Sequence, residues 1–150
     1  MRALSVLMLL AVLLTVASPA FAGGFGLGII LGEPTGICFK QWLTERNALD
    51  AAAAWSFGDE SAFQVHMDYL YHGPLGADID PGGMLYYVGI GGRFKATEDD
   101  SRIGVRLPLG LDYVFDDTPI DIFFEVAPIL DLAPSTDFSM NGSLGLRYFF

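Results

Sequence analysis

Three residue types of a hydrolase triad occur close together in the sequence: Ser56, His66 and Asp68. His66 and Asp68 are two positions apart, so they share one face if their segment is a strand. Ser56 lies on the preceding segment, before a chain-reversing turn, and is expected to lie diagonally across from His66. A serine beside an oriented histidine can attack an ester, which suggests a lipid hydrolase. The competing interpretation places His66 and Asp68 in an internal polar network without catalysis, and we favour it.

Other sequence signals for chemistry are weak. The segment GGFGLGIILG resembles part of a glycine-rich nucleotide motif, but no strand precedes it and no helix follows. No spacing of histidine, cysteine and carboxylates indicates a zinc site, and no basic patch indicates nucleic-acid binding. Cys38 is the only cysteine in the chain, so an internal disulfide is impossible. The sequence therefore predicts no catalytic residue, no cofactor and no metal.

The elements that would position these side chains are strands. The segment SRIGVRLPLGLDYVF, residues 101–115, alternates bulky apolar residues with small or charged ones. A period of two predicts a β-strand. Similar segments recur along the chain, separated by short turns rich in Gly, Pro, Asp, Asn and Ser. The predicted strands are eight: Phe25 to Leu31, Ile37 to Leu43, Ala48 to Phe57, Ala62 to His72, Met84 to Lys95, Arg102 to Phe115, Ile120 to Leu132 and Phe138 to Phe150.

An even number of short strands joined by short turns predicts an all-β fold, an eight-stranded antiparallel up-and-down barrel. One face of the strands carries large apolar residues, and the other carries glycine, alanine and charged residues. The interior of an eight-stranded barrel is barely wide enough for side chains, so the bulky face must point outward. Only lipid favours such a surface, which predicts a transmembrane barrel.

The charges support this orientation. The turns hold most of the acidic residues behind the net charge of −10. The small-residue face carries both signs, and charges in a narrow interior must be paired. We expect Arg147 beside Asp121 and Glu125, and Asp131 beside Arg102 and Arg106. Pro108 and Pro128 fall inside predicted strands, where each implies a bulge or a register slip.

The first residues predict export. A positive charge at Arg2, an apolar run and the small residues Ala20 and Ala22 are typical of a secretory signal peptide over residues 1–22. The run is short for a membrane-spanning anchor, which is the competing interpretation. Residues 23–150 then form one barrel domain.

Several segments resemble those of small bacterial outer-membrane barrels of the OmpA/OmpX-like kind, and of a poorly characterised group of short exported barrel proteins. They are LGEPTG, AWSFGD, HMDYLYH, YYVGIGGRF, RIGVRLPLGLDYVF, FEVAPILDL and LGLRYFF. The last segment, with Leu146, Tyr148 and Phe150 on one face, resembles the signal read by the outer-membrane assembly machinery.

The resemblance implies location in the bacterial outer membrane and contact with outer-membrane lipid and lipopolysaccharide. The resemblance brings no catalytic residues, and eight strands filled with arginine, acidic and aromatic side chains leave no continuous water path. We therefore expect a structural or envelope-integrity protein that is non-enzymatic and has no open pore. Two alternatives stay open at this point. One is a soluble periplasmic barrel that binds an apolar ligand, and the other is the lipid hydrolase.

Overall fold

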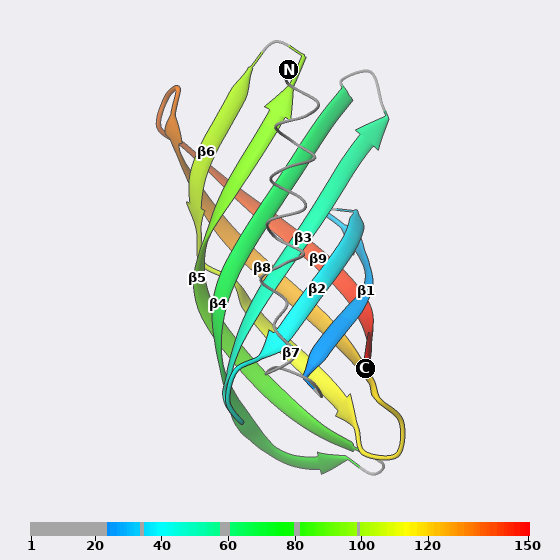
Figure 1. The fold of residues 1–150 in the computed structure, drawn as a ribbon. Helices are drawn as coiled ribbons and strands as arrows, with labels where there is room; N and C mark the ends of the chain where they lie inside the picture. Colours follow the sequence, from blue (N-terminus) through cyan, green and yellow to red (C-terminus); the bar gives the residue numbers. More distant parts are fainter. Residues whose placement is uncertain (1–23, 34, 58–60, 80–81, 99) are drawn as a thin grey trace.

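The described part of the chain forms nine antiparallel strands that close into a ring (Figure 1). The computed structural model describes residues 24–33, 35–57, 61–79, 82–98 and 100–150, so the predicted signal peptide lies outside the described residues. No helix of the described part is long and apolar enough to cross a membrane. The strands are β1 (Phe25–Gly32), β2 (Gly36–Trp42), β3 (Asn47–Phe57), β4 (Ser61–Ile79), β5 (Gly82–Thr97), β6 (Ser101–Arg106), β7 (Leu109–Phe115), β8 (Ile120–Ala133) and β9 (Asp137–Phe149).

The ring closes where β1 pairs with β9. This antiparallel pairing runs from Gly26 opposite Phe149 to Gly32 opposite Ser143. Elsewhere each strand pairs with the strands next to it in the chain, except around β6 and β7. Closure gives each of the described strands a partner on both sides, so no strand is an edge strand.

The predicted strand from Arg102 to Phe115 is divided into β6 and β7, which explains nine strands instead of eight. Both parts pair with β5 on one side and with β8 on the other. Leu107 and Pro108 separate them, because proline has no N–H to offer a ladder. The pairing of β6 with β8 also shifts register between Ile103 and Gly104.

Pro128, in contrast, stays inside β8 without changing which residues face outward. Its carbonyl accepts a hydrogen bond from Leu107 N at 3.0 Å, so this residue's backbone groups point toward the β6–β7 break. The missing N–H faces the same break, and the ladder between β8 and β9 continues past it. Inward and outward positions alternate through Leu132, so the bulge or register slip expected at Pro128 does not occur in the ladder between β8 and β9.

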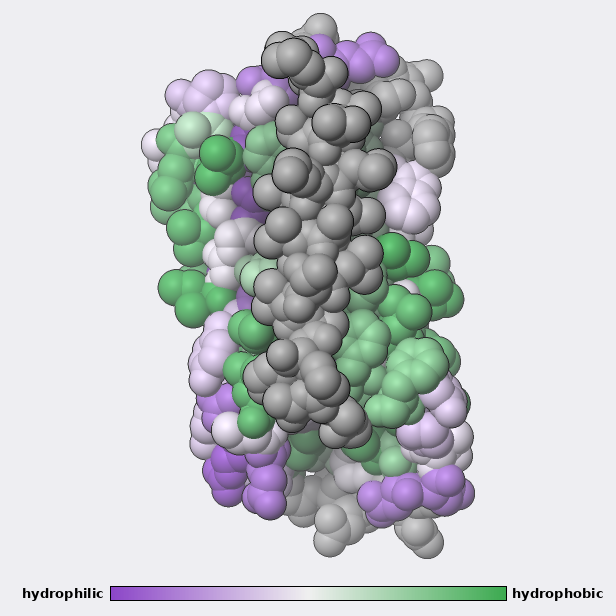
Figure 2. Space-filling model, viewed as in Figure 1, coloured by the Kyte–Doolittle hydropathy of each residue, from purple (hydrophilic) through white to green (hydrophobic). Residues whose placement is uncertain are grey.

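The two faces of the ring differ in polarity. Large apolar side chains point outward; Ile90 is 58% exposed and Leu144 is 51% exposed. Charged side chains point inward, where Arg106 and Arg147 are completely enclosed. Figure 2 shows hydrophobic residues over the middle of the visible face and hydrophilic residues toward both ends. The outward direction of the apolar face agrees with the sequence prediction.

Candidate functional site

The guanidinium of Arg147, on β9, is enclosed by three carboxylates inside the ring. It donates to Asp121 on β8, from Nε to Oδ1 at 2.9 Å and from Nη2 to Oδ2 at 2.8 Å. It also donates from Nη1 to Asp50 on β3 at 2.8 Å, and Nη2 lies 3.5 Å from Asp112 on β7. The Lys40 ammonium on β2 donates to Asp112 at 2.7 Å. This Arg147 cluster connects strands that are not neighbours in the sheet.

His72 extends the network toward the turn between β2 and β3. Lys40 Nζ lies 2.7 Å from Nε2 of His72, whose Nδ1 lies 3.1 Å from the carbonyl oxygen of Arg46. An ammonium can only donate, so Nε2 accepts and the proton of the neutral ring is on Nδ1. The Trp42 ring packs on the imidazole with centroids 4.4 Å apart. These contacts fill the interior at that turn.

Arg106, on β6, organises a second group of charges. It donates from Nη2 to Oε2 of Glu125 on β8, and its Nε lies 3.4 Å from Oδ2 of Asp68 on β4. The Tyr87 hydroxyl donates to the other oxygen of Glu125 at 3.1 Å. All four side chains are buried. One guanidinium therefore serves two carboxylates.

A third group joins β5 to β8. Arg93 Nη2 donates to both oxygens of Asp131, at 2.7 and 2.8 Å. Arg102 Nη1 lies 3.8 Å from Asp131 and 3.6 Å from Asp137, and its side chain is 43% exposed. Arg102 thus lies at the rim of the ring, where water weakens its ion pairs.

Inward-facing glycines make three of these contacts possible. In each of the three, the two partners lie on strands separated by a third strand, and a glycine stands between them in the pairing register. A side chain can therefore reach over the middle strand; a Cβ at Gly104 would lie 2.6 Å from Oδ1 of Asp131. The rows are Asp68–Gly91–Arg106, Arg93–Gly104–Asp131 and Tyr87–Gly110–Glu125.

The structure therefore changes two of the four expected pairings. Arg147 lies beside Asp121, and Asp131 lies beside Arg102. Glu125, however, contacts Arg106 rather than Arg147. Asp131 contacts Arg93 rather than Arg106. The Asp131–Arg93 contact was missed because it crosses one strand, over Gly104, whereas Glu125 meets Arg106 diagonally across the directly paired strands β6 and β8.

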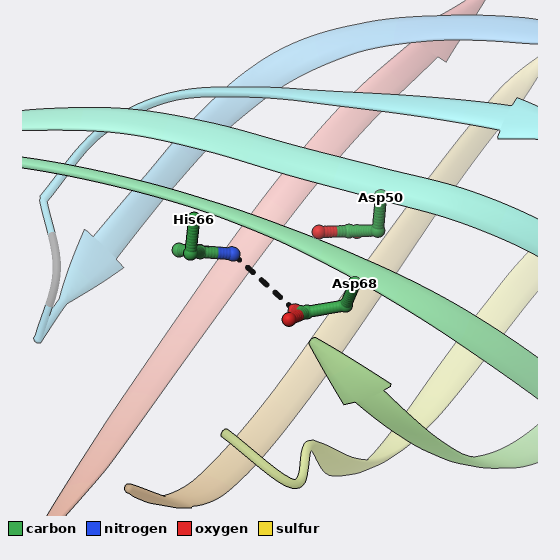
Figure 3. Close-up of side chains that lie close together, drawn as sticks. All are labelled: Asp50, His66 and Asp68. Atoms are coloured by element: carbon green, nitrogen blue, oxygen red, sulfur yellow. Dashed lines mark ion pairs between the residues drawn. The ribbon is translucent and has the colours of Figure 1, made fainter. Parts of the chain in front are cut away.

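Figure 3 shows how two of these carboxylates meet a histidine inside the ring: Asp50 from β3, with His66 and Asp68 from β4. Asp50 is directly opposite Asp68 in the pairing of the two strands. Nδ1 of His66 lies 3.3 Å from Oδ2 of Asp68. One ligand atom from each of the three residues lies within 4.8 Å of the others.

The predicted position of Ser56 is wrong. Ala52 is opposite His66 in the β3–β4 register, and Ser56 is opposite Ala62. Ser56 is therefore four residues farther along β3, roughly 13 Å at about 3.3 Å per residue, and its side chain is outside those described. His66 and Asp68 are in contact, but both are completely buried. The three residues do not form a triad geometry.

The residues of the predicted assembly signal point outward at the end of β9. Leu146, Tyr148 and Phe150 are all exposed. Phe150 N donates to the carbonyl of Phe25 on β1 at 2.9 Å, and the two rings stack with centroids 6.4 Å apart. The chain end thus lies beside the first strand, at the seam that closes the ring.

The comparisons with known proteins show the fold. At the level of sequence, no protein-family model and no curated protein matches the chain. Among solved structures, the ring is similar to the crystal structure of the N-terminal β-barrel domain of Pseudomonas aeruginosa OprF, with a TM-score of 0.66 and 15% sequence identity. The similarity covers 86% of this chain and 98% of that domain. The chain has a β-barrel fold.

The side chains inside this barrel had only a partial signal in the sequence. Alternation assigns Asp50, Arg93 and Tyr87 to the inner face. It does not say which of them meet, because contacts across the ring depend on strand register and on the glycine between two partners. The glycines at positions 91, 104 and 110 were the sequence signal that could have indicated which side chains meet.

Proposed function

We propose that this protein is an integral outer-membrane β-barrel of a bacterial envelope, with a structural role and no enzymatic activity. The observation that carries the proposal is the distribution of polarity: an apolar outer surface around an interior of buried ion pairs. A water-soluble protein has the opposite arrangement, whereas a lipid-embedded barrel requires this one. The likeness to the OprF barrel domain supports the fold on which the proposal depends.

In this proposal the barrel crosses the membrane with eight strands. β6 and β7 share both neighbours and are separated by two residues, so they act as the halves of one transmembrane strand. An even count places both ends of the chain on the same side of the membrane. The end of β9 then lies at the periplasmic rim.

The barrel has no open pore in this proposal. The side chains of Arg106 and Arg147 are enclosed, and each bridges carboxylates on two or more strands. The interior is thus crossed by charged groups at more than one level. Purified protein in a planar lipid bilayer should give no stable conductance steps, and regular steps would contradict the proposal.

The proposed partners are outer-membrane lipid, lipopolysaccharide and the assembly machinery. Exposed aliphatic residues such as Ile90 and Leu144 offer the lipid contact. The aromatic end at Phe150 offers the machinery an exposed strand terminus beside Phe25. We propose no nucleic-acid partner, since the chain is strongly acidic.

The envelope role is tested by deleting the gene and measuring uptake of a hydrophobic fluorescent dye. We expect dye uptake to rise and to return to normal when the wild-type gene is supplied. Unchanged uptake, together with unchanged growth in detergent, would contradict the role.

The two alternatives receive no support from the described residues. A barrel that binds an apolar ligand needs an apolar interior, but Arg106, Arg147 and Asp121 occupy it. A lipid hydrolase needs Ser56 beside His66, and the strand register separates them.

A further inference from the structure

We propose that Asp50, His66 and Asp68 form a binding site for one divalent transition-metal ion inside the barrel, with Zn²⁺ as the representative ion. The three side chains project into one space from adjacent strands (Figure 3). Ligand bonds of about 2.1 Å place two ligands of one zinc ion roughly 3.3 to 3.5 Å apart in a tetrahedral site. His66 Nδ1 and Asp68 Oδ2 are already 3.3 Å apart.

The three potential ligands are buried, and two of them, His66 and Asp68, make no hydrogen bond, while Asp50 accepts one from Arg147. Both ring nitrogens of His66 and both carboxylate oxygens of Asp68 are enclosed and form no hydrogen bond with the described residues, although Oδ2 of Asp68 lies 3.4 Å from Arg106 Nε. The two side chains are 2% and 1% exposed, respectively. Buried polar groups are almost always satisfied in native proteins, so these atoms are available to a bound species. A metal ion would satisfy one atom of each.

The charges in the interior favour a divalent cation. The buried charged side chains of the described residues are four cations, Lys40, Arg93, Arg106 and Arg147, and six carboxylates, Asp50, Asp68, Asp112, Asp121, Glu125 and Asp131. With neutral histidines they leave a formal charge of −2. One divalent ion neutralises this charge.

Two of the six buried carboxylates, those of Asp50 and Asp68, meet at this site. Asp50 and Asp68 are directly opposite each other on β3 and β4, and like charges in that position destabilise a sheet. Arg147 pairs with Asp50 and also with Asp112 and Asp121. Arg106 pairs with Asp68 and also with Glu125. Neither guanidinium is therefore available to Asp50 or Asp68 alone. A cation between the two carboxylates removes their repulsion.

The ligand chemistry selects the class of ion. Imidazole nitrogen binds zinc and similar first-row metals, while calcium and magnesium prefer sites made entirely of oxygen. One imidazole and two carboxylates therefore suit Zn²⁺. The strands surround the site, so we expect the ion to enter while the barrel folds and to exchange slowly afterwards.

The test uses the mature chain without a polyhistidine tag, refolded into detergent micelles with Zn²⁺ and then desalted. Metal content is measured by mass spectrometry, and folding is checked by the gel shift on heating. His66→Gln removes the nitrogen ligand. His72→Gln is the matched control, because His72 is also a buried inward-facing histidine but binds Lys40 instead. We expect about one zinc ion per chain in the wild type and in His72→Gln, and more than about tenfold less in His66→Gln.

Two results would overturn the site. One is a folded wild-type protein that retains almost no zinc, which would mean that a shared proton neutralises the two carboxylates. The other is equal retention by His66→Gln, which would place the metal on the acidic turns. If His66→Gln does not fold, wild-type protein refolded with Co²⁺ decides the matter. Visible absorption bands typical of bound Co²⁺ support the site, and their absence contradicts it.

Discussion

At the scale of single residues, Arg147 is the most connected cation of the interior. It donates hydrogen bonds to Asp50 and Asp121. Breaking a buried ion pair leaves an uncompensated charge, which usually costs more than the pair itself contributes. The interior should therefore be sensitive to loss of this one side chain.

We expect Arg147→Met to lower the free energy of unfolding by about 3–5 kcal/mol, since the Asp50 and Asp121 carboxylates lose their counter-ion. Urea unfolding in lipid vesicles, followed by tryptophan fluorescence, measures the change. Arg46→Met is the control, because Arg46 lies in an exposed turn and its loss should cost at most about 1 kcal/mol. Equal effects of the two substitutions would contradict the importance of the Arg147 cluster.

The sequence assigned individual residues to faces but not to partners. Alternation placed Asp121, Glu125 and Arg147 inside, and the structure does the same. Asp50 meets Asp68 only because the β3–β4 pairing has one particular register. A register two residues different keeps both carboxylates inward but separates them. Alternation alone cannot distinguish these registers.

At the scale of strands, the inward glycines determine which side chains meet. Gly91 and Gly92 are consecutive in β5 and face opposite directions, which makes them a matched pair. A Cβ at Gly91 would lie 2.7 Å from the Cα of Asp68, whereas the nearest atom at Gly92 is 3.9 Å away. The same chemical change therefore has different consequences at the two positions.

We expect Gly91→Ala to destabilise the barrel by about 1–3 kcal/mol, since the added methyl group overpacks the row between β4 and β6. Gly92→Ala should change stability little. Unfolding in urea measures both variants. A Gly91→Ala protein as stable as Gly92→Ala would show that the glycine rows are not tightly packed.

The last strand carries a separate prediction, which concerns assembly. Phe150→Ala should reduce the amount of protein in the outer membrane severalfold in cells, while the purified chain still refolds in detergent. Quantitative blotting of membrane fractions measures the amount. Phe138→Ala is the control, because Phe138 is exposed to the same degree at the other end of β9, 64% against 68%. Equal losses would contradict a special role of the chain end.

The strands were largely predictable because alternation with period two and turn residues define them locally. Residues 101–115 show where this method is insufficient. Alternation continues through Pro108, but the missing N–H divides the ladder there into β6 and β7. Pro128 is tolerated because its backbone faces the same break, and this depends on contacts between strands.

At the scale of the whole molecule, the direction of the two faces followed from side-chain volume. The interior of a narrow barrel could not contain the bulky residues, and the structure places them outside. Closure between β1 and β9 is a long-range contact that no local pattern specifies. The interior ion pairs likewise join residues far apart in the chain, such as Arg147 and Asp50.

A charge on the outer surface should be costly if lipid surrounds the barrel. Leu144 lies near the middle of β9 and points outward. We expect Leu144→Arg to destabilise the protein in lipid vesicles by about 2–4 kcal/mol, and Thr118→Arg in an exposed turn to have little effect. Urea titration compares the two. If Leu144→Arg did not lower the stability, the outer face would be in contact with water, which would contradict the proposal.

The most direct test of the proposed membrane barrel is the behaviour of the protein in fractionated cell envelopes. The outer-membrane fraction is extracted with detergent and run on an SDS gel with and without boiling. We predict that the protein stays with the outer membrane and changes mobility on boiling, as a closed barrel in lipid does. Release with the soluble periplasm, without any shift on boiling, would contradict a lipid-embedded barrel.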